Sequence, residues 1–128
     1  RRLIGLSWAW AVGVGLAFVP TSALLVRALR PLAEATIGSS AGYLPPLLAL
    51  LACTALLGKR RHPATPALLL TALLFAASLT FRTLDQPLCA SWPLGTHWIW
   101  HLLNAVVLAR LMRTLAAFGP VGAYSSKW

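Results

Sequence analysis

Long apolar segments separated by short polar stretches dominate the pattern of this chain. The four segments cover residues 6–29, 43–58, 64–82 and 96–117. About 20 helical residues cross the roughly 30 Å of hydrocarbon in a bilayer. The pattern therefore predicts an all-α integral membrane protein with four transmembrane helices, the second of them short.

Prolines fall at two informative places in these segments. Pro20 stands beside Thr21 and Ser22, whose hydroxyls can compensate for a lost backbone hydrogen bond, so we expect the first helix to kink there without ending. Pro45 and Pro46, in "YLPP", suit the first turn of the second helix, where a backbone N–H is not needed.

Polar stretches between the segments predict the connections. "GKRRHPATP" predicts a tight basic turn, and "TLDQPLCASWPLG" predicts a loop that places Asp85 where the third helix ends and Cys89 outside it. Glu34, in "PLAEATIGSSAG", is predicted to be a solvated loop residue. Residues 119–128 lack periodicity and are predicted to form a flexible tail after a transmembrane domain of residues 1–118.

The composition of the 128 residues supports a membrane protein. Hydrophobic residues make up 59% and charged residues 10%, with a mean hydropathy of +0.75, which leaves too few polar groups to coat a soluble domain. The net charge of +9 does not indicate nucleic-acid binding, because the basic residues lie at the ends of apolar runs.

Basic residues also predict the orientation in the membrane. Eight are predicted on one side and three on the other, which predicts cytoplasmic termini and an external loop before residue 97. The eight are Arg1, Arg2, Lys59, Arg60, Arg61, Arg110, Arg113 and Lys127, and the three are Arg27, Arg30 and Arg82.

The beginning of the chain admits two interpretations. Because residue 1 is arginine, we interpret the sequence as a processed or incomplete product. Arg1 and Arg2 before an apolar run also resemble a signal peptide, although the run continues past a usual h-region without a small-x-small cleavage site. Two cysteines, Cys53 and Cys89, are too few for a disulfide framework and have no metal-ligand spacing.

Two histidines at the start of the fourth segment are the main candidates for chemistry. Thr96 can cap this helix, and His97 and His101 then lie on one face, which Asn104 extends. Ionisable groups at membrane depth mark a site by default, and imidazoles four apart can share a metal ion, but zinc needs further ligands. The alternative is an interfacial His97 in an aromatic belt, with His101 and Asn104 forming interhelical hydrogen bonds.

Other polar residues have mainly structural interpretations. Arg82 and Asp85 are three apart and can pair to neutralise each other; alternatively, such a pair can orient a metal-bound histidine. His62 is predicted to be an exposed residue on the side opposite His97. Haem ligation ranks below zinc, because His97 and His101, one turn apart, cannot occupy opposite faces of one porphyrin.

The stretch "FRTLDQPLCASWPLGTHWIWHLLNAVVL" resembles the C-terminal part of the alkaline ceramidase family, in the CREST superfamily of seven-helix membrane hydrolases, and especially its bacterial ceramidase-domain proteins. The similar features are Asp85, Cys89 four residues later, and an HxxxH motif in which Trp100 precedes the second histidine. "AGYLPPLLALL" and "RRHP" fit the same group. The chain then corresponds to helices four to seven of the bundle.

The resemblance implies a zinc ion held by three histidines, two of which are His97 and His101, in a bacterial inner-membrane protein. The third histidine, a serine and an aspartate belong to early helices of that family and are not found here; Ser7, Ser22 and Ser78 have no accompanying histidine.

The implied activity is hydrolysis of the amide bond of ceramide or a related membrane lipid, with Arg82, Asp85 and Asn104 as support. Residues 1–128 alone are then expected to be inactive without the N-terminal helices of the same protein. The competing hypothesis is a non-enzymatic receptor or assembly subunit, in which the polar stripe formed by His97, His101 and Asn104 packs against other helices.

Overall fold

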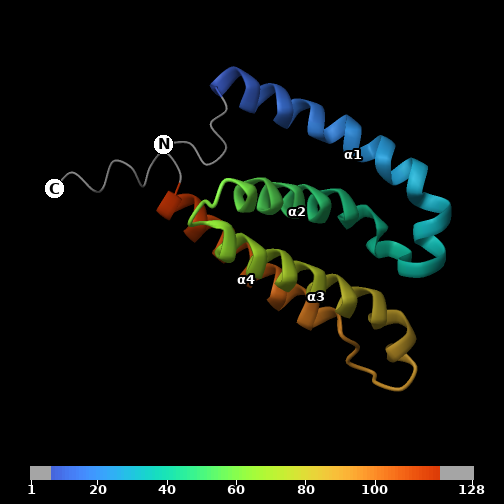
Figure 1. Cartoon of the computed structure of the whole chain (residues 1–128). Coiled ribbons are helices and arrows are strands. Elements are labelled where there is room, and N and C mark those ends of the chain that lie inside the picture. The colour runs from blue at the N-terminus through green and yellow to red at the C-terminus, as the bar shows by residue number, and fades with distance from the viewer. Residues whose placement is uncertain (1–6, 119–128) are drawn as a thin grey trace.

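The structure is a computed structural model, and it describes residues 7–118 as an array of antiparallel helices (Figure 1). A short 3₁₀ helix, a tight turn and a loop link the four α-helices in chain order, so that successive helices reverse direction. The elements are α1 (Trp8–Ile37), the 3₁₀ helix η1 (Gly38–Tyr43), α2 (Leu44–Lys59), α3 (Thr65–Cys89) and α4 (His97–Phe118).

Each α-helix lies in a helical stretch that is long and apolar enough to cross a membrane; for α2 this stretch begins in η1 and runs over Ser40–Lys59. The candidate spans have mean hydropathies of 1.9, 1.7, 1.8 and 1.3 in chain order. The prediction of an all-α protein with four transmembrane helices is therefore confirmed. α2 and α4 begin and end within one residue of their predicted bounds.

Helix α1 is longer than the predicted segment 6–29. It continues through Pro31 and ends at Ile37, and the prediction that Glu34 lies in a loop is wrong, because the backbone there is helical. The hydropathy falls after residue 29, but leucine, alanine and glutamate remain good helix formers. Apolarity and helix propensity therefore end at different residues.

The predicted continuation of α1 through Pro20 is confirmed. The hydroxyl of Thr21, the next residue, donates to the carbonyls of Ala17 at 2.6 Å and Phe18 at 3.1 Å. Such a hydroxyl satisfies backbone acceptors locally, as expected beside a proline in an apolar helix.

Helix α3 also extends beyond its predicted segment, 64–82. It includes Asp85 and ends at Cys89, with Pro87 inside its last turns. The prediction that Cys89 lies in a loop is wrong, because the helix continues for seven residues after the hydropathy drops. Asp85 is therefore presented by a rigid helix rather than by the end of one.

Packing is closest between α3 and α4, with α2 against α3. The buried residues of α4 are Trp100, Val107 and Thr114, which recur every seven residues and so form one stripe along the helix. α3 buries residues that include Thr71, Ala72 and Ser78. By contrast, none of the most apolar stretch of α1 is buried.

Candidate functional site

The carboxylate of Asp85 joins the C-terminal part of α3 to the beginning of α4. Its Oδ1 accepts the backbone N–H of Thr96 at 2.7 Å and that of His97 at 2.9 Å. The first N–H groups of a helix lack partners within the helix, and a negative charge there is favoured by the helix dipole. Asp85 therefore caps α4 from a neighbouring helix.

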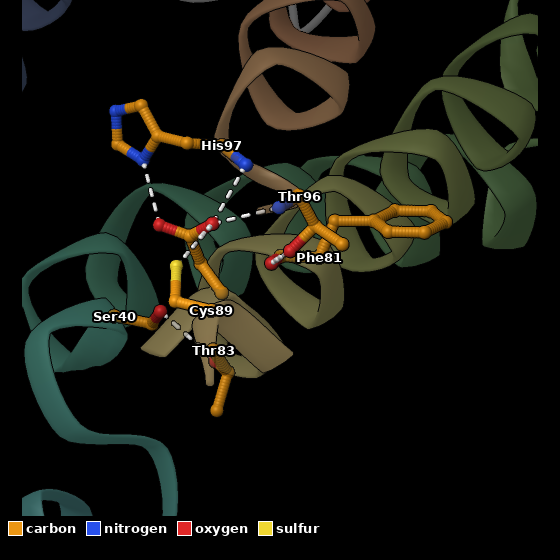
Figure 2. A network of polar contacts seen from close by, with 7 residues as sticks. Ser40, Phe81, Thr83, Cys89, Thr96 and His97 are labelled. Carbon is orange, nitrogen blue, oxygen red and sulfur yellow. Dashed lines mark hydrogen bonds and ion pairs between the residues drawn. The ribbon is translucent and has the colours of Figure 1, made fainter. Parts of the chain in front are cut away.

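Thr96 precedes α4 as predicted, but its side chain does not cap the helix. Its buried hydroxyl instead donates to the carbonyl of Phe81 on α3 at 2.6 Å (Figure 2). The prediction for this side chain is wrong because a charged acceptor, Asp85, already takes the N-terminal amides. Three hydrogen bonds thus tie the start of α4 to α3: two from the backbone N–H groups of Thr96 and His97 and one from the Thr96 hydroxyl.

Gly95 allows this close approach. Its φ of +57° lies in the left-handed region, where side chains are disfavoured. A Cβ placed there would clash with the Asp85 Oδ1 and lie 3.0 Å from the Cys89 Sγ. The glycine before α4 is therefore required both by the backbone conformation and by the space that the carboxylate fills.

Asp85 also lies beside the first candidate metal ligand. Its Oδ2 is 3.5 Å from His97 Nδ1, while its Oδ1 holds the backbone of the same residue. A carboxylate next to Nδ1 favours the tautomer that carries the proton there and leaves Nε2 as the free nitrogen. The arrangement thus orients the His97 imidazole.

His97 and His101 lie on one face of α4, as the spacing predicts. Their ring centroids are 4.8 Å apart, and both side chains are exposed. The centroid of the Trp100 ring lies 4.9 Å from that of His97 and 4.3 Å from that of His101. The two imidazoles are close enough to act on one ligand and are accessible to it.

Arg82 does not pair with Asp85, although the two are three residues apart. Among the described residues, the carboxylate contacts α4 instead, while the guanidinium carbon of Arg82 lies 5.1 Å from the centroid of Tyr43 and 4.5 Å from that of Trp100. The capping of α4 explains the difference, because it draws Asp85 away from its neighbour on α3.

Asn104 forms a polar contact within the bundle. The buried hydroxyl of Ser78 donates to Asn104 Oδ1 at 3.1 Å and to the carbonyl of Phe75 at 2.9 Å. A second contact between elements joins Thr83 to Ser40 of η1 at 2.9 Å (Figure 2). The polar stripe of α4 thus divides into an exposed part, His97 and His101, and a part that packs against α3.

His62 lies at the opposite end of α4 from His97. The centroid of its ring is 5.8 Å from that of Phe118, the last residue of α4. Its Nδ1 accepts the Ala64 N–H at 3.1 Å. It is half-buried rather than exposed as predicted, because the turn folds it under the end of α4. Its position agrees with the prediction that it does not join the His97 pair.

Among the side chains that the structure describes, no group of three or more histidine, cysteine or acidic residues is arranged to hold a metal ion. Cys89 Sγ is 3.9 Å from Asp85 Oδ1, which is a contact with the capping carboxylate. The described site therefore provides two imidazoles and an orienting carboxylate, to which a metal site would have to add a ligand.

These features define a multi-pass α-helical membrane protein with a histidine pair at one end of its array. No family model, curated protein or solved structure matches the chain.

Sequence reasoning missed two features of the site: the capping of α4 by Asp85, and the aromatic surroundings of Arg82. A glycine directly before a predicted helix, with an acid near the end of the preceding helix, is the signal that could have indicated the first.

Proposed function

We propose that the chain forms part of a zinc-dependent membrane hydrolase that cleaves the amide bond of ceramide or a related lipid amide. The observation that carries this proposal is the contact between Asp85 and His97. An imidazole that ligates a metal almost always places its other nitrogen against a carboxylate, a carbonyl or water. Asp85 provides such a partner, next to a histidine whose ring faces a second histidine.

His97 and His101 are the residues that would hold the zinc ion, His97 through Nε2 because Nδ1 faces Asp85. When bound, zinc supplies a hydroxide near neutral pH and polarises a carbonyl group. Asp85 fixes both the start of α4 and the His97 ring, so that backbone and imidazole are positioned by one side chain. Asn104 supports the same helix through Ser78.

A third ligand must come from outside the described residues. Structural and catalytic zinc sites use at least three protein ligands, and residues 7–118 provide no third histidine near this pair. The exposed faces of α1 and of the His97 pair leave room for further helices. We propose that the four helices correspond to helices four to seven of a seven-helix bundle in a bacterial inner membrane, with the basic turn at residues 59–61 in the cytoplasm.

The test is the zinc content of the purified protein as its gene encodes it. We expect one zinc ion per protein in the wild type and a loss of most of it in His97→Ala and in His101→Ala. His62→Ala is the matched control, because it removes a histidine at the far end of α4. A protein without zinc, or with zinc content unchanged in the first two variants, would reject the proposal.

A non-enzymatic receptor or assembly subunit is the second candidate. The bond between Ser78 and Asn104 favours it, since a buried polar pair between two helices is a common packing device in membranes. In that case, substitution of the histidines would change the association of helices and leave metal content and lipid turnover at the background level.

A further inference from the structure

We infer that the lipid amide bound at this site carries a carboxylate close to the amide, as an N-acyl amino acid does, and that Arg82 binds the carboxylate. This inference rests on the proposed function and narrows its substrate class.

The guanidinium of Arg82 lies against two aromatic rings, Tyr43 and Trp100, which contact each other edge to face with their centroids 5.9 Å apart. Its Cζ lies 5.1 Å from the centroid of Tyr43, at the end of η1, and 4.5 Å from that of Trp100, on α4. Rings in contact with a guanidinium hold it by cation–π interaction, which does not use the hydrogen-bonding capacity of its N–H groups. Three elements thus fix the position of one cation.

Hydrogen-bond donors in this cluster lack acceptors. Arg82 Nε and Trp100 Nε1 are both buried, and neither has a hydrogen-bond partner among the described residues. Buried donors are nearly always paired in native proteins, and one that is not paired calls for an explanation such as a bound ligand. The only carboxylate nearby in sequence, Asp85, is engaged by α4.

An anionic group is the acceptor that this cluster fits. A carboxylate can take two parallel hydrogen bonds from the edge of a guanidinium, and it balances a cation that is costly at membrane depth. Ceramide offers only neutral hydroxyls, which would leave the charge of Arg82 uncompensated. The surroundings of Arg82 therefore favour a negatively charged lipid amide.

Arg82 and the two histidines border the same Trp100 ring, which favours an anion close to the amide. The Trp100 ring that lies 4.5 Å from Arg82 Cζ is also 4.3 Å from the His101 ring and 4.9 Å from the His97 ring. In an N-acyl amino acid, the carboxylate is attached to the carbon that bears the amide nitrogen. A carboxylate at Arg82 would thus hold the amide beside the histidines.

Hydrolysis of such a lipid needs only water. The bond between the carbonyl carbon and the nitrogen breaks, the oxygen of water adds to the carbonyl carbon, and the nitrogen takes up a proton. The products are a fatty acid and a free amino acid. An apolar cavity of about 340 Å³ has a volume suited to part of an acyl chain, and its lining residues include Tyr43, Leu50, Phe75, Asn104, Val107 and Leu111.

The test compares two lipids that differ only in the group attached to the carbon that bears the amide nitrogen. N-palmitoylglycine carries a carboxylate where N-palmitoylethanolamine carries a neutral hydroxymethyl group, and both have the same chain and amide. Equilibrium binding of each radiolabelled lipid is measured on the full protein in phosphatidylcholine nanodiscs, without metal. We expect the glycine conjugate to bind about tenfold more tightly, because it alone forms the charge-assisted pair.

Substitutions test whether Arg82 causes the preference for the carboxylate lipid. Arg82→Gln should abolish it, and Arg82→Lys should retain only part of it, because lysine keeps the charge but loses the planar fork. Arg27→Gln, an exposed arginine on α1, is the control and should keep the full preference. Equal binding of the two lipids by the wild type, or a preference that survives in Arg82→Gln, would overturn the inference.

Two further outcomes separate this inference from its alternatives. Displacement of N-palmitoylglycine from the wild type by a small fraction of phosphatidylglycerol would overturn it, because a phospholipid phosphate would then be the occupant. A charge preference in a protein without zinc would reject the hydrolase and retain the anion site, whereas zinc binding with turnover of neutral amides and no charge preference would reject the anion site alone.

Discussion

Asp85 accepts the backbone N–H of Thr96 at 2.7 Å, so a side chain in the last part of α3 holds the first turn of α4. The same carboxylate extends to the His97 ring at 3.5 Å. Helix capping and orientation of an imidazole are therefore not separable functions here, and a change at Asp85 acts on both.

Replacement of Asp85 tests the cap. Asp85→Ala should lower the free energy of unfolding by about 1–3 kcal/mol, because two N–H groups at the helix start lose their acceptor. Hydrogen exchange at the Thr96 and His97 amides should accelerate in this variant and remain slow in the α4 interior. Unchanged exchange at these two amides would show that the carboxylate does not cap α4.

Gly95 should tolerate no side chain. Gly95→Ala should cost about 1–2 kcal/mol from the left-handed backbone alone, and more from the contact with Asp85. Gly42→Ala in η1 is the control, because a Cβ there meets nothing within 4 Å. Thermal unfolding in detergent measures both, and equal midpoints for the two variants would contradict the prediction.

The bond between Ser78 and Asn104 should contribute modestly to helix packing. A double-mutant cycle with Ser78→Ala and Asn104→Ala should give a coupling free energy of about 0.6 kcal/mol, and at most about 1.7 kcal/mol, as for polar contacts between other membrane helices. Reversible unfolding in mixed micelles provides the measurement. A coupling near zero would mean that the two side chains do not interact.

Residues 1–128 alone should bind zinc weakly and hydrolyse no lipid amide. Two imidazoles leave the ion to complete its shell with water or weak ligands, and it loses the affinity of a third fixed imidazole. Zinc titration and turnover of both ceramide and N-palmitoylglycine, measured beside the protein as its gene encodes it, test this expectation. Robust turnover by residues 1–128 would disprove it.

The orientation in the membrane can be tested with the native cysteines. Cys89 is exposed at the end of α3 that we place outside, and Cys53 is half-buried within α2. A membrane-impermeant thiol reagent should therefore label Cys89 in intact cells and leave Cys53 unlabelled. In Cys89→Ser, a cysteine introduced as Pro63→Cys in the basic turn should react only after the membrane is opened; the reverse pattern would invert the topology.

The sequence predicted the number and order of the helices because hydropathy directly reports the length of apolar chain. It placed the ends of α1 and α3 too early, because leucine, alanine and glutamate extend a helix after the hydropathy falls. Residues such as Glu34 and Cys89 were consequently assigned to loops. Hydropathy indicates which residues enter the membrane, and it does not indicate where the backbone hydrogen bonds of the helix end.

Of the candidate site, the common face of His97 and His101 followed directly from their spacing of four residues. The partner of Asp85 did not, because Arg82 is nearer in sequence while the amides of α4 are nearer in space. Such a choice depends on how closely α3 and α4 approach, and this approach is set by Gly95 and by the Thr96 hydroxyl. Local spacing carries no information about it.

The absence of burial along the most apolar stretch of α1 has a consequence for the order of assembly. Helices insert into a bilayer individually before they associate, and association needs contacts between helices. α3 and α4 are joined by the buried stripe of α4 and by the hydrogen bonds that Asp85 and Phe81 of α3 accept from the start of α4. We therefore expect this pair to assemble first and α2 to join it along α3. α1 should insert as readily as the others but associate last, which leaves it available to exchange neighbours after the rest of the array has formed.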